Sequence, residues 1–106
     1  MSNIKLNYLY RDAANYKNHG RAIFANASNI GLHEIDKTLR NNLLDGEYFY
    51  ANHWGLKDLH FEKYDEQDDH PYHEFVAIEF TEEAPTESYS IATLLQRVKK
   101  ANREWR

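Results

Sequence analysis

The chain has 106 residues, with 13 Lys and Arg against 17 Asp and Glu and a formal net charge of −4 at pH 7. This length has room for one hydrophobic core, so we expect residues 1–106 to form a single compact domain. The acidic balance disfavours a general binder of nucleic acids or of anionic membranes. The absence of cysteine excludes a disulfide framework and any Cys-ligated zinc or iron–sulfur site. Because no run approaches the roughly 18 apolar residues of a membrane span and the amino terminus lacks an apolar signal segment, we expect a cytoplasmic protein.

The chain opens with a segment that predicts a strand over residues 4–11. Apolar and aromatic side chains alternate there with polar ones at the two-residue period of a half-buried strand, at Ile4, Leu6, Tyr8 and Tyr10. Residues 21–25 form a short apolar run that could pair antiparallel with this strand. The polar connection between the two ends at Gly20 and is long for a tight hairpin, so we expect Tyr16 and His19 to be displayed at a loop.

A helical period follows from residue 32. Apolar side chains recur at steps of three and four, at Leu32, Ile35, Leu39 and Leu43. Gly31 is an acceptable N-cap with Glu34 in the first turn, and Asp45-Gly46 supplies the expected stop. Apolar residues at helical spacing are usually core, so we expect this helix to pack on the sheet.

The stretch from Gly46 to Phe75 holds eight of the fifteen aromatic residues and four of the six histidines. Within it we predict a strand over 47–51 and a turn over 52–57 that Trp54 anchors. Residues 59–64 are either another strand or an irregular crossing. The acidic segment 65–72 contains proline and has no apolar period, which predicts a solvated loop.

The last third of the chain predicts a strand and a helix. Residues 73–81 alternate, with Val76, Ile78 and Phe80 on one face and Phe75, Ala77 and Glu79 on the other. After a linker over 82–88, Ser90 is the expected N-cap of an amphipathic helix. Its apolar set is Ile91, Leu94, Leu95, Val98, Ala101 and Trp105. The fold that these elements predict is α+β, a small antiparallel sheet of three to five strands with two helices packed on one face.

Histidines and carboxylates are concentrated in the second half of the chain, at His53, His60, Asp68, Asp69, His70, His73 and Glu74. Imidazole together with carboxylate suits zinc, manganese or iron. Metal motifs gain specificity when two ligands share one rigid element, whereas His70 and His73 flank a proline. We therefore expect no metal, no cofactor and no catalytic residues. The alternative is a metal-dependent hydrolase or phosphodiesterase that uses His53, His60, His70 and His73.

Two further functions have weaker support in the sequence. Acid–base catalysis by two histidines, or by His53 with Glu47, requires groups within hydrogen-bond reach of one substrate, which spacing cannot show. Nucleic-acid binding would stack bases on strand tyrosines, but tyrosine is common in strands and the chain is acidic.

The function that the sequence favours is a non-enzymatic protein-interaction or regulatory module. Fifteen aromatic residues exceed what a thin core should enclose, and tyrosine is the one most readily left at the surface. If Phe49 points inward, Tyr48 and Tyr50 point outward. With Tyr8 and Tyr10 they would form a partner-binding aromatic face. We expect a protein partner, with a basic one favoured by the acidic balance, or a homo-oligomer.

The two readings make different structural predictions. A hydrolase should bring His53, His60 and the carboxylates of 68–74 into one concave pocket. An interaction module should leave these groups dispersed and should show a flat aromatic patch.

Overall fold

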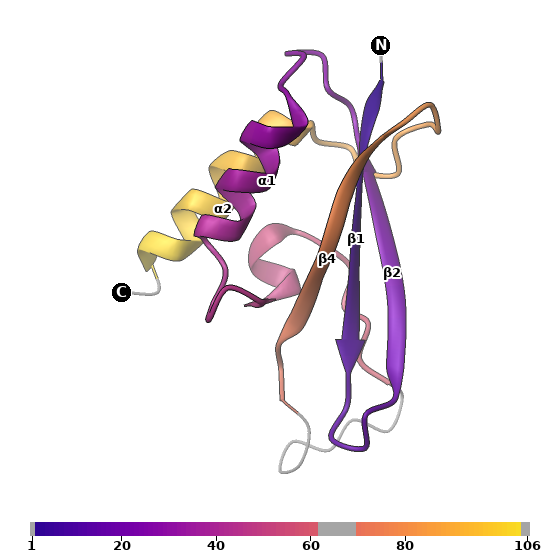
Figure 1. The fold of residues 1–106 in the computed structure, drawn as a ribbon, viewed down its shortest axis with the longest axis vertical. Helices are drawn as coiled ribbons and strands as arrows, with labels where there is room; N and C mark the ends of the chain where they lie inside the picture. Colours follow the sequence, from indigo (N-terminus) through magenta and orange to yellow (C-terminus); the bar gives the residue numbers. More distant parts are fainter. Residues whose placement is uncertain (1, 62–69, 105–106) are drawn as a thin grey trace.

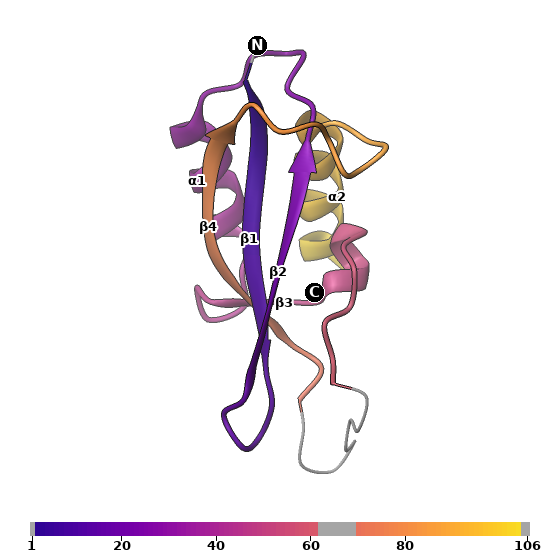
Figure 2. The same ribbon diagram turned by 90° about the vertical axis from the view of Figure 1, so that its right-hand side faces the viewer.

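The computed structural model describes residues 2–61 and 70–104, which form an antiparallel sheet with two helices on one face (Figures 1 and 2). The elements are β1 (Asn3–Arg11), β2 (Lys17–Phe24), α1 (Leu32–Asn41), β3 (Tyr48–Phe49), the 3-10 helix η1 (Ala51–Trp54), β4 (His73–Thr81) and α2 (Ile91–Glu104). The four strands lie in the order β2-β1-β4-β3. The predicted α+β class, with both helices on the same face, is therefore confirmed. No helix in the described part of the chain has the length and apolar character needed to cross a membrane.

The central strand β1 pairs with β2 on one side and with β4 on the other. Its helix-facing side chains are buried, as the alternation predicts, at Ile4, Leu6, Tyr8 and Tyr10. Strand β2 begins at Lys17, four residues earlier than predicted, because the polar residues Lys17 to His19 pair with β1 although their side chains are exposed or half-buried. The hairpin loop is therefore shorter than expected. Tyr16 lies in it, 69% exposed, whereas His19 lies in the strand.

Strand β4 has the predicted bounds but not the predicted faces. Tyr8 pairs with Phe75 and Asn7 pairs with Ala77, so Val76 is an extra residue at a β-bulge. The bulge moves Phe75 onto the helix-facing side, where Ile78 also packs against the core. The expected placement of Phe75 on the face opposite to Ile78 is wrong, because simple alternation cannot register one inserted residue.

Both helices bury the apolar stripes that predict them. Helix α1 buries Ile35 and Leu39, and it ends at Asn41, so Leu43 lies beyond it. Helix α2 follows Ser90, whose Oγ accepts the N–H of Thr93 at 3.3 Å. Its buried residues are Ile91, Leu94, Leu95 and Val98. The predicted core residue Trp105 lies outside the described residues.

Residues 55–61, which we call the crossing segment, pass over the helix-facing side of the sheet without regular structure. Gly20 of β2 makes room for them, since a Cβ there would lie 2.7 Å from Leu59 Cδ1. The sheet also holds their backbone: Tyr8 Oη donates to the Lys57 carbonyl at 2.7 Å, and Asn18 Nδ2 donates to the Leu59 carbonyl at 2.9 Å. These bonds satisfy backbone oxygens that no strand partner reaches. Of the two readings offered for 59–64, the irregular crossing applies to 59–61, and the remainder lies outside the described residues.

Candidate functional site

The two faces of β3 separate its aromatic residues. Phe49 is opposite His73 and is 2% exposed, and its ring stacks on Trp54 with centroids 4.1 Å apart. Tyr48 is opposite Glu74 and is half-buried, as is Tyr50. Phe49 therefore points into the core while its two neighbours remain accessible, which is the orientation that the sequence predicts.

Tyr48 and Tyr50 belong to a continuous row of rings. Tyr72 links them, with centroids 6.0 Å from Tyr48 and 5.0 Å from Tyr50. His53 extends the row from Tyr50 at 5.0 Å, and His70 extends it from Tyr72 at 5.6 Å. We call these five residues the aromatic strip. Four are half-buried and His53 is exposed, so the strip is a surface feature.

A hollow of about 520 Å³ opens beside the strip, lined by Leu44, Asp45, Tyr48, His70 and Tyr72. The charge of Glu47, with a smaller contribution from Glu74, raises the pKa of the Tyr48 hydroxyl, which indicates a negative local potential. Arg11 pairs with Glu74 at 2.9 Å and neutralises part of that charge. Asp45 and Glu47 are exposed beside the rings.

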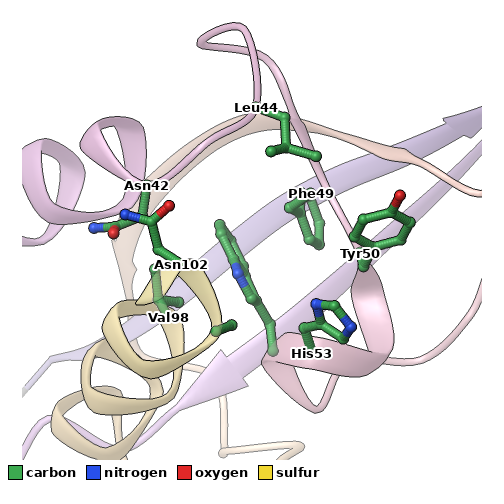
Figure 3. Close-up of a pocket in the computed structure, with 9 residues that line it drawn as sticks. Asn42, Leu44, Phe49, Tyr50, His53, Val98 and Asn102 are labelled. Atoms are coloured by element: carbon green, nitrogen blue, oxygen red, sulfur yellow. The ribbon is translucent and has the colours of Figure 1, made fainter. Parts of the chain in front are cut away.

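The strip rests on the core rather than on open space. Figure 3 shows Tyr50 and His53 beside a cavity that Phe49 and Val98 also line. That cavity has a volume of about 20 Å³, which is room for about one water molecule. Burial, together with a hydrogen bond to Tyr72, raises the pKa of Tyr50 to about 12. Tyr50 is therefore held by its burial and by its hydrogen bond to Tyr72.

The prediction that Tyr8 and Tyr10 contribute to this surface is wrong. They are 2% and 0% exposed and lie on the helix-facing side of the sheet, beneath the crossing segment. Tyr10 Oη donates to the His70 carbonyl at 2.7 Å, so both hydroxyls bond backbone oxygens inside the fold. Neither ring can stack on a nucleic-acid base in this structure. The alternation placed them together but did not show that another segment covers them.

A second group of polar side chains lies where the crossing segment meets β4. Asp58 and His60 belong to the crossing segment, and His73 is the first residue of β4. His60 Nδ1 is 3.1 Å from Asp58 Oδ2, and His73 Nε2 is 3.5 Å from Asp58 Oδ1. One ligand-type atom from each residue lies within 4.8 Å of the others. The Tyr10 ring packs against both imidazoles, with centroids at 4.4 Å from His60 and 5.3 Å from His73. We call these three residues the histidine–aspartate group.

His73 is the buried member of the group. Its Nε2 accepts the N–H of Leu59 at 3.0 Å, so the proton of the neutral ring is on Nδ1. Burial lowers the pKa of His73 to about 4, although the Asp58 carboxylate acts in the opposite direction. The ring is therefore neutral at physiological pH, and its Nε2 lone pair faces Leu59 and Asp58.

The histidines and carboxylates that the sequence singles out do not all converge. His60 and His73 meet, whereas His53 and His70 belong to the aromatic strip. Glu74 points to the other face of the sheet, where it pairs with Arg11. Asp68 and Asp69 lie outside the described residues.

Sequence reasoning missed Asp58. Its signal was the Asp-x-His spacing with His60, which places an aspartate and a histidine on one short segment. The group borders a hollow of about 490 Å³, whose lining also includes Asn18, His19, Arg21 and Lys57.

Comparisons of the chain with models of protein families, with curated proteins and with solved structures gave no match.

Proposed function

We propose that this protein is a non-enzymatic interaction module that binds a basic protein partner through the aromatic strip. The observation that carries the proposal is the continuity of the strip, in which Tyr72 joins Tyr48 and Tyr50 at the edge of an open hollow. Tyrosine is enriched at binding hot spots because its ring offers a large contact area with few rotatable bonds.

The charges around the strip support a basic partner. Asp45 and Glu47 are exposed beside Tyr48, and the chain has a net charge of −4. A lysine or arginine side chain in the hollow would meet the rings of Tyr48 and Tyr72 and the carboxylate of Asp45. Affinity should therefore fall as the salt concentration rises, because exposed ion pairs are screened.

The test compares ring deletions inside and outside the strip. Tyr48→Ala and Tyr50→Ala remove strip residues, and Phe80→Ala removes a ring that is 49% exposed elsewhere. Phe80 is six residues along β4 from Glu74, the partner of Tyr48, which is about 20 Å. Proteins captured by each variant are identified, and the recovered partner is purified and titrated directly. Sedimentation velocity measures self-association in parallel.

The expected result is a basic partner that binds the wild type and Phe80→Ala equally and binds the two strip variants about tenfold more weakly or worse. Equal binding by all variants, or a partner that is acidic, would contradict the proposal. Concentration-dependent self-association that Tyr50→Ala abolishes would show that the strip binds a second copy instead.

A metal-dependent hydrolase or phosphodiesterase is the second candidate function. The observation in its favour is the convergence of Asp58, His60 and His73 beside an open hollow. Only two of its four expected histidines take part. Such an enzyme needs a metal site first, so the candidate depends on metal binding at the histidine–aspartate group.

A further inference from the structure

The histidine–aspartate group brings three metal-ligand side chains close to the spacing of a first coordination sphere. With bonds of 2.0–2.1 Å, the ligands of a tetrahedral zinc ion lie about 3.3 Å apart. In the histidine–aspartate group, His60 Nδ1 lies 3.1 Å from Asp58 Oδ2, and His73 Nε2 lies 3.5 Å from Asp58 Oδ1, the other oxygen of the same carboxylate. Taken with one atom from each residue, the three ligand atoms all lie within 4.8 Å of one another, so they would have to close in by at most about 1.5 Å to hold one ion.

The group is also held in place by the fold. Bonds from Tyr8 to the Lys57 carbonyl and from Asn18 to the Leu59 carbonyl anchor the backbone on each side of Asp58. The Asp58 carboxylate accepts the N–H of His60 at 2.8 Å, which orients it further. Such supporting bonds reduce the reorganisation that metal binding requires.

The exposure of the three side chains suits access from solvent. The side chain of His73 is 2% exposed, whereas that of Asp58 is 61% exposed and borders the hollow of about 490 Å³. An ion could therefore enter from the Asp58 side and keep water as its fourth ligand. Lys57 and Arg21 line the same hollow, where they could hold an anion against the ion.

We propose that Asp58, His60 and His73 form a binding site for one divalent transition-metal ion of the zinc class. Two imidazoles and one carboxylate favour zinc over magnesium or calcium, which prefer oxygen ligands. His73 would bind through Nε2. The N–H of Leu59 would then lose its present acceptor, which weakens the site relative to a structural zinc centre. The inference is independent of partner binding by the aromatic strip.

The experiment is a titration of tag-free wild-type protein with zinc chloride by isothermal calorimetry. The variants are Asp58→Asn and His60→Gln, which alter the two ligands on the crossing segment, and the control is His53→Gln, which alters an exposed histidine of the strip. We expect one zinc ion per chain with a Kd at or below about 10 µM in the wild type and the control. Each ligand variant should bind about tenfold more weakly or worse.

A second measurement needs no variant. Nitrogen-15 NMR of the wild type should show a large shift of His73 Nε2 and of the Leu59 amide on zinc addition, because coordination replaces their hydrogen bond. The absence of binding up to about 100 µM zinc would overturn the proposal. So would binding that survives both ligand substitutions, or zinc shifts that spare His73 and Leu59.

Discussion

Substitution of Gly55 by alanine tests how η1 is held against α2. Gly55 follows η1 with φ +75°, and the Tyr89 hydroxyl donates to the carbonyls of Trp54 and Gly55 at 3.0 Å. The Arg97 guanidinium stacks on the Tyr89 ring with its carbon 4.2 Å from the centroid. A methyl group at Gly55 would overlap Nη1 of Arg97 and would lie 2.9 Å from the Tyr89 hydroxyl. Backbone strain and crowding therefore act at the same position.

The chain supplies a control that separates these two costs. Gly46 has φ +72°, and no described heavy atom lies within 4 Å of the place where its Cβ would stand. Gly46→Ala should therefore show the left-handed backbone cost alone, about 1 kcal/mol. Gly55→Ala adds the loss of the Arg97–Tyr89 stacking and the weakening of the Tyr89 hydrogen bonds, each about 1 kcal/mol. The expected total is about 3 kcal/mol.

Urea unfolding followed by circular dichroism and by tryptophan fluorescence measures both values, provided that the slope against denaturant is unchanged. The expected excess of Gly55→Ala over Gly46→Ala is about 2 kcal/mol. An excess below about 0.5 kcal/mol would refute the reasoning. It would mean that Arg97 and Tyr89 rearrange without loss.

Three further predictions concern the core and the crossing segment, each measured by the same unfolding experiment. Phe49→Ala should cost about 3–5 kcal/mol, and Tyr50→Ala should cost less because its ring is half-buried; the reverse order would show that the faces of β3 are misassigned. Leu95→Ala should cost about 2–4 kcal/mol because Leu95 is buried, and an unchanged free energy of unfolding would show that this face of α2 does not contribute to the core. Tyr8→Phe should cost about 1 kcal/mol by deleting the bond to the Lys57 carbonyl; a neutral result would show that this bond does not hold the crossing segment.

Local periodicity by itself determined much of this fold. Alternation identified β1 and the bounds of β4, and helical spacing identified the buried stripes of both helices. Alternation also predicted the two faces of β3, because Tyr48 and Tyr50 must point outward if Phe49 points inward. These properties depend on side chains a few residues apart, which share one element and one face.

Only the tertiary structure decided the properties that depend on distant partners. Pairing with β1 extended β2 back to Lys17 and inserted the bulge at Val76, since backbone hydrogen bonds act regardless of side-chain polarity. The crossing segment covered Tyr8, which alternation alone left available to the surface.

The same crossing assembled the histidine–aspartate group. Asp58 is fifteen residues from His73 in the chain, yet their side chains lie 3.5 Å apart because residues 55–61 fold back over the start of β4. Gly20 permits this approach by leaving room for Leu59. A contact between an irregular segment and a strand has no period, so its residues can be recognised only once the chain has folded.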